Sequence, residues 1–301
     1  MRSCLKGIND KGIIIKGIGG FYSVLTDDGN TYVCKARGLF RKQQKTPVIG
    51  DWVEFDHDEE SGYLIAILPR RNELVRPAVA NIDKLFIVIS ASRPSADLLL
   101  VDKLIICCEK LHIMPIIVIN KCDDAPNHES EAIVDEYRLT DYPIYKVSAA
   151  TGDGLDALKN ELRGSIVCLA GQSAVGKSSL LNAIIPGIKL AVGDLSRKTE
   201  RGRHTTRHAE LIPLNGSGAV LDTPGFSLLD SIEVEPEEIK NYYPELRRHK
   251  GECRFNGCLH VTEPGCAVKQ ELLGNGFNKE RYSRYVRLVN EAVEIRRHRY
   301  D

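Results

Sequence analysis

Residues 171–178 have the sequence Gly171-Gln172-Ser173-Ala174-Val175-Gly176-Lys177-Ser178. This is the G-x-x-x-x-G-K-[ST] pattern of a phosphate-binding loop. Upstream of it stands Asn120-Lys121-Cys122-Asp123, which has the N-K-x-D form that selects guanine. In an ordinary GTPase the phosphate loop precedes the base-selecting motif. The reversed order therefore predicts a circularly permuted GTP-binding domain with further parts attached at both ends.

The residues around the phosphate loop support this interpretation. Apolar residues 166–170 predict a strand that ends directly at the loop, and an apolar helix is predicted over 177–185. Backbone amides at the helix N-terminus would surround the phosphates. Lys177 would reach the β- and γ-phosphates, and the Ser178 hydroxyl would bind Mg²⁺. We include Ser179, the next residue, in the predicted nucleotide site.

The base-selecting residues follow another predicted strand, over 115–120, and ligands of open parallel sheets bind at the carboxyl ends of strands. The Asp123 carboxylate can accept hydrogen bonds from N1–H and the N2 amine of guanine. Adenine lacks these donors. Binding adenine would leave the buried carboxylate without hydrogen bonds, which costs about 1–3 kcal/mol of binding free energy. Ser148-Ala149 follows the predicted strand 144–147 and would offer a backbone amide to guanine O6. Together these segments predict GTP rather than ATP.

Two further segments have the character of GTPase switches. Asp222-Thr223-Pro224-Gly225 matches the D-x-x-G pattern, in which Asp222 supports the Mg²⁺ shell and the Gly225 amide senses the γ-phosphate. Gly202-Arg203-His204-Thr205-Thr206 lies between the phosphate loop and the next strand, where the first switch belongs. We expect Thr206 to complete the metal shell, with Thr205 as the alternative.

The catalytic group has to be predicted from elsewhere in the chain, because the glutamine that many GTPases use is absent. Phe226 follows Gly225, where many GTPases have a water-orienting glutamine. Hydrolysis then needs a polar group from elsewhere, and His204 in the first switch is the candidate, able to orient or deprotonate water. The alternative is a solvated loop histidine with no role. A slow intrinsic rate that requires an activating partner follows from this interpretation.

The central region alternates strands and helices, which predicts a parallel sheet with helices on both faces. Predicted strands are 85–90, 115–120, 144–147, 166–170, 209–213 and 219–221, and predicted helices are 97–112, 130–139, 154–163 and 177–185.

The first 69 residues contain five short apolar runs separated by turn signals, at 12–16, 21–25, 31–34, 51–55 and 63–67. Five short strands fit an OB-type barrel. Although the whole chain has a formal net charge of zero, residues 1–50 carry nine basic and three acidic side chains. The barrel is therefore predicted either to bind RNA or to serve as a structural cap.

The C-terminal region contains Cys253-x4-Cys258-x-His260-x5-Cys266. Three thiolates and one imidazole at this spacing predict a closed tetrahedral site for one structural Zn²⁺ ion. A terminal helix is predicted from about Lys279, with Arg281, Arg284 and Arg287 on closely spaced turns. These arginines, interleaved with tyrosines, suit RNA, and they equally suit a solvated helix surface.

The composition is that of an ordinary globular protein, with 301 residues, 43% hydrophobic and 27% charged. No apolar run approaches the roughly 20 residues that span a bilayer, and the N-terminal residues lack the apolar run of a signal peptide. We therefore expect a cytoplasmic protein without membrane partners. The six cysteines outside the cluster are expected to be reduced thiols.

The complete set of motifs resembles the RsgA family, also called YjeQ or YloQ, circularly permuted GTPases that assist late maturation of the bacterial small ribosomal subunit. The resemblance rests on the motif order, on Arg37-Gly38-Leu39-Phe40-Arg41 and Gly50-Asp51 near the N-terminus, and on the Cys₃His cluster. It implies GTP hydrolysis stimulated by the 30S subunit, 16S rRNA gripped by the barrel and the zinc domain, and His204 as catalytic residue. We expect a monomer. Ala174 departs from the family, which has glycine there, and its methyl group disfavours positive φ.

The predicted fold class is multidomain. It comprises an N-terminal OB-type β-barrel (1–69), a central, circularly permuted α/β P-loop GTPase domain (70–228), and a C-terminal, mainly helical zinc-binding domain with the terminal helix (229–301). Two other functions fit the same motifs. One is a GTP-dependent metal or RNA chaperone unrelated to ribosomes, and the other is a nucleotide sensor that does not hydrolyse GTP.

Overall fold

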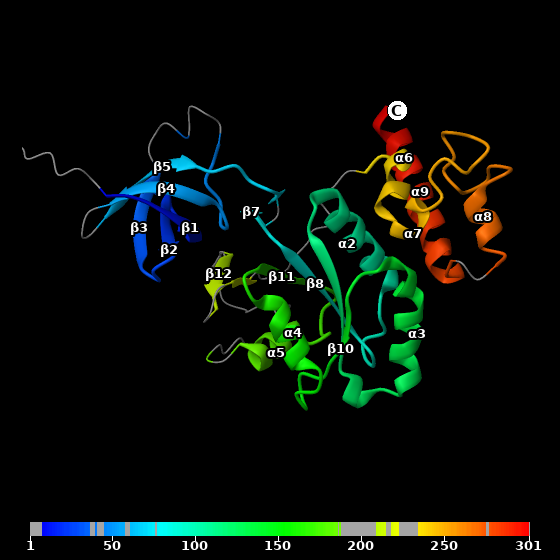
Figure 1. Ribbon diagram of the computed structural model, residues 1–301, viewed down its shortest axis with the longest axis horizontal. Helices are drawn as coiled ribbons and strands as arrows, with labels where there is room; N and C mark the ends of the chain where they lie inside the picture. The colour runs from blue at the N-terminus through cyan, green and yellow to red at the C-terminus, as the bar shows by residue number, and fades with distance from the viewer. Residues whose placement is uncertain are drawn as a thin grey trace, which may run out of the picture. The chain divides into compact units, whose positions relative to one another are not determined.

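The computed structural model describes residues 8–36, 40, 45–57, 61–75, 77–185, 187, 209–214, 218–222, 234–274 and 277–300 (Figure 1). The chain divides into two compact units. The first comprises Met1–Leu85, Lys159–Leu169 and Asp194–Ser231, and the second comprises Phe86–Leu158, Ala170–Gly193 and Ile232–Asp301.

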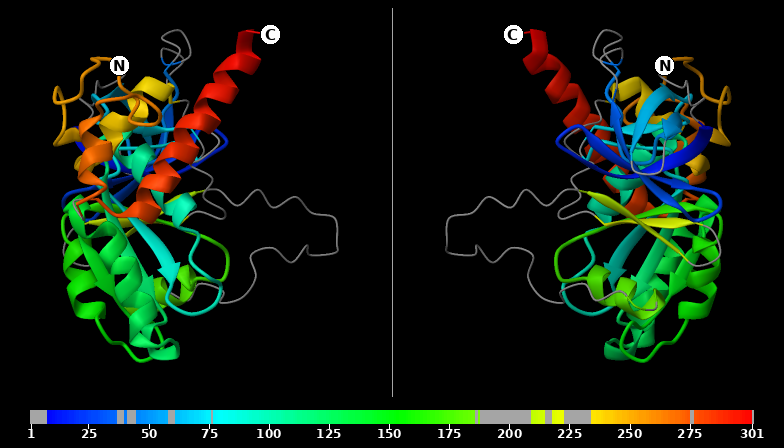
Figure 2. Two further views of the ribbon diagram at one scale, coloured as in Figure 1. Left: turned by 90° about the vertical axis from the view of Figure 1, so that its right-hand side faces the viewer. Right: turned by 90° about the vertical axis from the view of Figure 1, so that its left-hand side faces the viewer.

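A closed five-stranded barrel occupies the N-terminal part of the first unit (Figure 2). Its strands are β1 (Ile8–Ile18), β2 (Phe21–Thr26), β3 (Thr31–Ala36), β4 (Trp52–His57) and β5 (Gly62–Ile67). They pair in the order β1-β2-β3-β5-β4, and β4 returns to pair with β1. This is the connectivity of an OB-fold, so the predicted barrel is confirmed.

The barrel closes around a small apolar core. Alternate residues of the strands point inward, and the inward set is fully apolar: Ile14, Val24, Cys34, Val53, Phe55 and Leu64. Phe40, which lies between β3 and β4, belongs to the same core. At the edge of this core the Asp51 carboxylate is completely buried, where it accepts from Arg70 Nε at 2.7 Å and from the Val48 amide at 2.8 Å. The ion pair fixes the chain that leaves β5 against the entry to β4.

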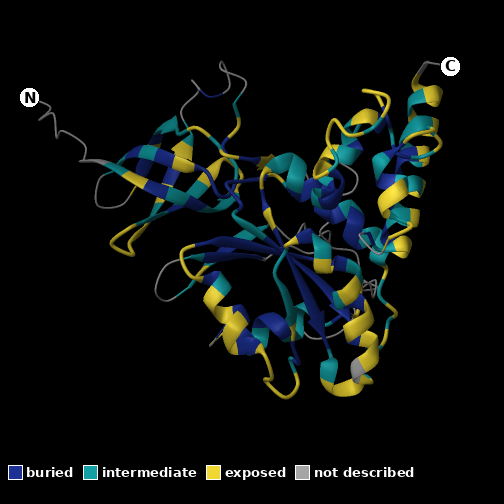
Figure 3. Cartoon of the chain, turned by 45° about the vertical axis from the view of Figure 1, so that its right-hand side comes forward, coloured by how far each residue is buried: buried dark blue, intermediate teal, exposed yellow. Residues whose placement is uncertain are grey.

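Six strands form the central sheet, in the order β10-β9-β8-β11-β13-β12. They are β8 (Lys84–Ser90), β9 (Met114–Asn120), β10 (Ile144–Lys146), β11 (Ile166–Ala170), β12 (Glu210–Pro213) and β13 (Ala219–Asp222), and a separate ribbon joins β6 (Glu73–Leu74) to β7 (Val79–Ala80). Strands β8, β9 and β11 are buried along almost their whole length, as Figure 3 shows in dark blue. Continuous burial is typical of strands covered on both faces.

The prediction of a wholly parallel sheet is wrong at one edge. Strands β9 and β10 are parallel, as are β11 and β13, but β12 pairs antiparallel with β13. The connection between β12 and β13 covers only residues 214–218. A parallel pair needs a crossover of a dozen or more residues, so this short connection forces a hairpin.

The predicted helices of the central region are confirmed within a few residues at each end. They are α2 (Leu98–Leu111), α3 (Asn127–Tyr137), α4 (Leu155–Leu162) and α5 (Lys177–Ile184), with single 3₁₀ turns η1 (Cys122–Asp124) and η2 (Arg138–Thr140). Within the second unit, α2 and α3 lie on one side of β8–β10 and α5 on the other (Figure 1). The Asp97 side chain caps α2 by accepting from the Leu100 amide at 3.0 Å.

The C-terminal part is mainly helical, as predicted. It contains α6 (Pro236–Ile239), η4 (Lys240–Tyr242), α7 (Pro244–Arg247), α8 (Ala267–Glu271) and the long α9 (Lys279–Tyr300). Tyr285, Leu288 and Val289 of α9 pack in one apolar cluster with Tyr243 and Leu246. None of the described helices is both long enough and apolar enough to cross a bilayer.

A buried ionic network joins α9 to α2 and α7 within the second unit. The Arg281 guanidinium is 1% exposed and contacts the carboxylates of Asp102 and Glu245. It also lies over the Tyr137 and Tyr243 rings, 4.7 and 4.6 Å from their centroids. Burial raises the pKa of Asp102, and the neighbouring guanidiniums of Arg281 and Arg284 oppose this rise. The surrounding cations therefore favour the charged form of this buried carboxylate, and burial opposes it.

The network predicts a large loss of stability for Arg281→Ala. Removing the guanidinium leaves two buried carboxylates without their main counter-charge, which costs about 3–5 kcal/mol of unfolding free energy. Urea unfolding followed by far-UV circular dichroism measures this loss. The fluorescence of the single tryptophan, Trp52 in β4, separately follows the barrel.

Arg287→Ala is the matched control. Arg287 lies on the same helix, is 65% exposed and pairs with Glu291 one turn away, so its removal should change stability by no more than about 0.5 kcal/mol. Equal effects of the two substitutions would show that the buried network does not stabilise this part of the fold.

Candidate functional site

The phosphate loop has the strand-loop-helix context that the sequence predicts. Strand β11 ends at Ala170, and α5 begins at Lys177 with Gly176 as its N-terminal cap. Gly176 has φ +93°, and a Cβ at this position would lie 2.5 Å from Asn120 Nδ2. A Cβ on Gly171 would lie 2.0 Å from the Val88 carbonyl oxygen of β8. Both glycines are thus required by close approach as well as by backbone conformation.

Lys177 lies inside the loop. Its Nζ donates to the carbonyl oxygens of Gly171 at 2.8 Å and Gln172 at 2.6 Å. Burial lowers the pKa of this amine. A partly buried cation beside the N-terminus of α5 makes a site for the negative charge of a phosphate chain. Ser178 and Ser179 follow in the first turn of the helix.

Asn120 connects three loops of the site. It is the last residue of β9, and its side chain is buried. Its Nδ2 donates to the Val175 carbonyl of the phosphate loop at 2.9 Å, and its Oδ1 accepts from the Ala149 amide at 3.1 Å. The sequence places Asn120 among the base-contacting residues. In the structure its side chain holds the phosphate loop and the Ser148-Ala149 turn at fixed positions.

Lys121 makes a second link to the phosphate loop. It has a left-handed backbone, φ +61°, and its Nζ donates to the Ala174 carbonyl at 2.8 Å and the Arg93 carbonyl at 2.6 Å. Ala174 itself has φ +63°. Alanine is expected to be unfavourable there, because a non-glycine residue in this conformation costs about 1–2 kcal/mol. The two strained residues face each other across one hydrogen bond.

A segment that the sequence analysis missed completes the frame. Residues 92–97 follow β8, provide the Arg93 carbonyl for Lys121, and include Asp97, whose amide donates to Gln172 Oε1 at 3.0 Å. The available signal was their position at the carboxyl end of a strand, which is where open sheets build ligand sites. The side chain of Gln172 thereby joins the phosphate loop to the cap of α2.

These loops enclose a cavity of about 430 Å³. It is lined by Asn120, Lys121, Asp123, Asp124, Ala149, Ala150, Gly176 and Ser179. The Asp123 carboxylate thus borders the same space as Gly176 of the phosphate loop. Asp124 and Ala150 are further lining residues, which were not predicted from the sequence. Ser148 supports the turn, since its Oγ accepts from the Ala150 and Thr151 amides at 3.2 and 3.0 Å.

Of the remaining predicted site residues, the structure describes Cys122 and Asp222 and does not describe the others. Cys122 is absent from the cavity lining; its Sγ donates to the Ile119 carbonyl, and burial raises the pKa of its thiol. Asp222 is the last residue of β13. His204, Thr205, Thr206, Gly225 and Phe226 lie outside the described residues.

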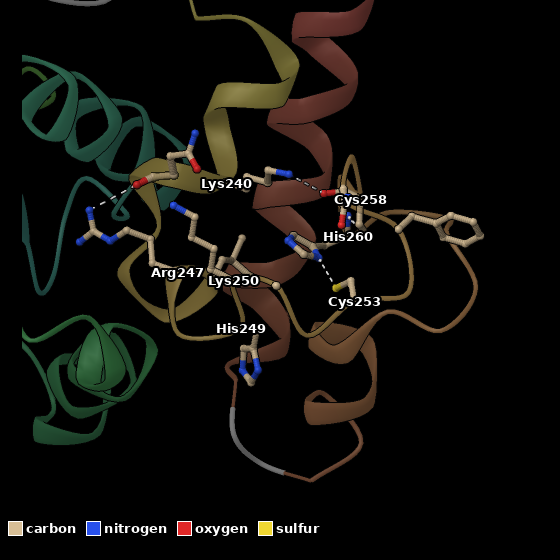
Figure 4. Close-up of a pocket in the computed structure, with 12 residues that line it drawn as sticks. Lys240, Arg247, His249, Lys250, Cys253, Cys258 and His260 are labelled. Carbon is tan, nitrogen blue, oxygen red and sulfur yellow. Dashed lines mark hydrogen bonds between the residues drawn. The ribbon is translucent and has the colours of Figure 1, made fainter.

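The predicted Cys₃His set comes together in space. Figure 4 shows three of its members, Cys253, Cys258 and His260. One ligand atom from each of Cys253, Cys258, His260 and Cys266 lies within 4.8 Å of the others, so the group could hold a metal ion. His260 Nδ1 is 3.5 Å from Cys253 Sγ and 3.3 Å from Cys266 Sγ. Two backbone amides, of His260 and Ala267, donate to sulfur atoms of the cluster at 3.4 Å.

The electrostatics of the cluster favour a bound cation. Burial raises the pKa of the Cys258 thiol to about 12 and also raises that of Cys266. Burial lowers the pKa of His260, which keeps its imidazole neutral and available as a ligand. Three adjacent sulfur atoms can be thiolates here only if a cation offsets their charge.

Helix α9 and neighbouring groups fix the loop that carries these ligands. The hydroxyls of Tyr282 and Tyr285 donate to the carbonyls of His260 and Leu259, at 2.7 and 2.5 Å. Lys240 Nζ donates to the Cys258 carbonyl at 3.0 Å, a bond drawn in Figure 4. The ligand loop is therefore held from outside the metal cluster as well.

Two of the α9 arginines differ from the predicted solvated or RNA-binding surface, whereas Arg287 is 65% exposed. Arg281 is buried, and Arg284 is mostly buried against Asp102 and Glu136 at 2.6 Å. Arg296, Arg297 and Arg299 each pair with a glutamate. Much of the positive charge of this helix thus balances acids of the protein itself.

Comparison with known proteins decides the family. The family model described as RsgA GTPase matches residues 67–232, and that described as RsgA N-terminal domain matches residues 11–64. The chain belongs to the RsgA GTPase family. It is 44% identical to the small ribosomal subunit biogenesis GTPase RsgA of Caldanaerobacter subterraneus subsp. tengcongensis over 96% of this chain and 98% of that protein.

Solved structures agree with this assignment. The crystal structure of YjeQ from Thermotoga maritima is 36% identical, with a TM-score of 0.85 over 95% of this chain and 99% of its own. That of YloQ, described as a circularly permuted GTPase, is also 36% identical, with a TM-score of 0.82 over 98% of both chains. The resemblance on which the sequence analysis relies is confirmed, and so is the predicted three-part fold class.

The contact between Gly176 and Asn120 predicts that Gly176→Ala weakens GTP binding at least about tenfold, or roughly 1.4 kcal/mol. The new methyl group would push the Asn120 side chain away from Val175 and Ala149, so the base-selecting and phosphate-binding loops would separate. Isothermal titration calorimetry with GTP measures the change.

Gly187→Ala provides the control, because Gly187 also has positive φ, +86°, but no atom of the described residues lies within 4 Å of its added Cβ. It carries the same backbone penalty without the clash. If both variants bind GTP alike, the clash has no effect on the nucleotide site.

The cluster geometry predicts that Cys258→Ser removes bound metal and lowers the melting temperature of the C-terminal helices, because a serine hydroxyl is a poor ligand beside two thiolates. Metal content per chain by inductively coupled plasma mass spectrometry and thermal circular dichroism measure the two effects. Cys107→Ala changes another buried cysteine and should leave metal content unchanged. Unaltered metal in the Cys258 variant would rule out the assigned ligand set.

Proposed function

We propose that this chain is a GTPase that binds the small (30S) ribosomal subunit and assists its late maturation, hydrolysing GTP to GDP and phosphate with stimulation by the subunit. The observation that carries the GTP part is the convergence of the base-selecting motif and the phosphate loop on one cavity, through the two hydrogen bonds of Asn120. The ribosomal part rests on the names of relatives that match this chain over nearly its full length.

The nucleotide site divides into three tasks. Asp123 accepts from the guanine base, and Lys121 covers it, while Asn120, Cys122 and the Ser148-Ala149 turn hold the base-selecting loops. Residues 171–178, with Ser179, enclose the phosphates by backbone amides and the Lys177 amine. The cavity lining supports this division, because Asp123 and Gly176 border the same space.

Magnesium belongs with the bound GTP. The Ser178 hydroxyl and Thr206 would hold the ion, Asp222 would support its water shell, and the Gly225 amide would sense the γ-phosphate. The position of Ser178 in the first turn of α5 suits this task. Magnesium would neutralise the charge that develops on the β- and γ-phosphate oxygens during transfer.

Hydrolysis requires a water molecule aligned with the γ-phosphate. Phe226 has no group that can hold this water, so the proposal gives the task to His204, whose ring nitrogen would accept a proton or a hydrogen bond from it. In this proposal the ribosomal subunit positions His204, which accounts for the stimulated rate.

One structural Zn²⁺ ion is assigned to Cys253, Cys258, His260 and Cys266. Three sulfur donors and one nitrogen are the ligands that structural zinc takes, and four protein ligands leave no position for a reacting water. The ion would stabilise the ligand loop between α7 and α8.

The partners and boundaries follow from the same proposal. The barrel and the zinc-binding part would contact 16S rRNA, and the protein would act as a cytoplasmic monomer. The division into residues 1–69, 70–228 and 229–301 is retained as the proposed domain organisation.

Stimulated turnover tests the function and its catalytic group together. Purified 30S subunits should raise the GTPase rate well above that of the protein alone, and His204→Ala should lower the stimulated rate by about 10²–10⁴-fold while leaving GTP affinity unchanged. Phosphate release measures the rate, and calorimetry with GTP and ATP measures affinity and base selection.

His128→Ala, at an exposed position of α3, serves as the matched histidine control and should retain full stimulation. A wild-type protein that binds GTP but stays silent with subunits would be a nucleotide sensor, and the proposal would be wrong. Persistent stimulation in the His204 variant would remove only the catalytic assignment.

A further inference from the structure

A cavity borders the Cys₃His cluster directly (Figure 4). It has a volume of about 240 Å³, and Cys253, Cys258 and His260 belong to its lining. A water molecule occupies about 30 Å³ in the liquid, so the cavity has room for several molecules of that size. Small polar reagents can therefore come into contact with the metal ligands.

The three sulfur ligands differ in exposure. Cys258 and Cys266 are each 2% exposed, whereas Cys253 is partly exposed. Cys253 and Cys258 each accept one backbone amide on sulfur at the same distance, 3.4 Å, so these hydrogen bonds do not distinguish them. Oxidation of a cysteine depends on its exposure as well as on its thiolate character. Cys253 is therefore the ligand that a reagent in the cavity reaches first.

The lining of the cavity is positively charged. Lys240, Arg247 and Lys250 belong to it, and the described residues that line it include no acid. Arg247 also pairs with Glu109, outside the lining, and Lys240 donates to the Cys258 carbonyl. A cysteine reacts as the thiolate, and metal coordination keeps it deprotonated. Cations around the cavity would stabilise a hydroxide ion that leaves during oxidation.

Backbone contacts hold Cys253 and Cys266 together without the help of a metal. The Arg254 amide donates to the Gly265 carbonyl at 3.2 Å, so the residues next to the two cysteines are paired. The Ala267 amide donates to Cys253 Sγ at 3.4 Å. The two sulfur atoms are 4.0 Å apart and would have to approach by about 2 Å to form a disulfide.

Cys258 belongs to a segment that is held separately. Its carbonyl accepts from Lys240 Nζ at 3.0 Å, and the carbonyls of the next two residues accept from tyrosine hydroxyls of α9. These three bonds do not involve the metal, so they would keep residues 258–260 in place when the ion leaves. Cys266, whose backbone is tied to that of Cys253, is therefore the sulfur best placed to react with it.

We propose that Cys253 is an oxidation site, at which hydrogen peroxide converts Cys253 and Cys266 to a disulfide and thereby releases the zinc ion. The inference rests on the zinc assignment in the proposed function and adds a modification of its ligands. It makes the fold of the ligand loop sensitive to peroxide, and with it the proposed RNA contact of the C-terminal part.

The reaction balances in two steps. The Cys253 thiolate attacks one oxygen of hydrogen peroxide, an S–O bond forms, the O–O bond breaks, and hydroxide leaves with the electron pair. The Cys266 thiolate then attacks the Cys253 sulfur, the S–S bond forms, and the S–O bond breaks to release a second hydroxide. Two thiolates are thus oxidised by two electrons in total, and one peroxide is reduced. The ion loses two of its four protein ligands and is released.

Zinc release from the full-length, zinc-loaded protein tests the proposal. Zinc per chain is first determined by inductively coupled plasma mass spectrometry, and hydrogen peroxide is then added in the presence of a zinc-binding dye. The wild type should release its zinc, and peptide mass spectrometry should find a disulfide between Cys253 and Cys266. Dithiothreitol with added zinc should restore the original content, because a disulfide is reducible whereas a sulfinic acid is not.

Two variants with the same Cys₂His₂ ligand set make the result specific. Cys253→His replaces the oxidisable sulfur by an imidazole, which structural zinc also accepts, so this variant should bind zinc and keep it under peroxide. Cys266→His, the matched control, retains Cys253 and should accumulate its sulfenic acid, which dimedone traps. Cys122→Ala removes the other partly exposed cysteine among the described residues and should release zinc as the wild type does. If Cys253→His binds no zinc, the peptide map of the wild type decides alone.

The proposal is overturned if the wild type keeps its zinc under peroxide, if a cysteine other than Cys253 is oxidised first, or if Cys253→His releases zinc as fast as the wild type. A wild-type protein that holds no zinc before oxidation would refute the zinc assignment and the inference with it. Stimulation of GTP hydrolysis by 30S subunits, measured before oxidation, tests the remaining function independently. A zinc-loaded, stimulated protein that resists peroxide would remove the oxidation site and leave the proposed function.

Discussion

The nucleotide site depends on one buried amide side chain. Asn120 is the only described residue whose side chain bonds both to the phosphate loop and to the Ser148-Ala149 turn. Its two bonds have fixed donor and acceptor directions, so the three loops hold one relative position rather than several. In the proposed site the Asp123 carboxylate would have to lie at a set distance from the phosphates, and the two bonds of Asn120 would set that distance. Lys121 adds a second bond to the same loop.

The motifs were predictable because each residue type has a chemical task and each motif ends a strand. The links between them were not. Asp97 and Gln172 are 75 residues apart in the sequence, and their contact depends on the order of strands, which motif spacing does not determine. The hairpin of β12 and β13 was predictable from its short connection. The burial of Arg281 also had a signal, since it shares a helix face with Tyr285 and Leu288 of the apolar cluster.

Helix α9 supports two different structures on its N-terminal half. Arg281 and Arg284 face the acids of α2, α3 and α7, whereas Tyr282 and Tyr285 hold the loop of the metal ligands. The two members of each pair are three residues apart and lie close together on the helix, whereas the adjacent residues Arg281 and Tyr282 diverge, so one short stretch can serve both neighbours. The small C-terminal part thus combines apolar packing with ionic contacts and with the loop of the Cys₃His cluster, each anchored to the same helix.

The permuted chain order has a consequence for synthesis on the ribosome. A nascent chain folds from its N-terminus as it emerges, so β8 and β9 are available before the phosphate loop exists. Asn120 leaves the tunnel 55 residues ahead of Val175, the partner of its amide. During translation the guanine-selecting segment is therefore made before the phosphate loop that completes the pocket. The pocket forms only when β11 pairs with β8, and β13, the other neighbour of β11, is synthesised later still.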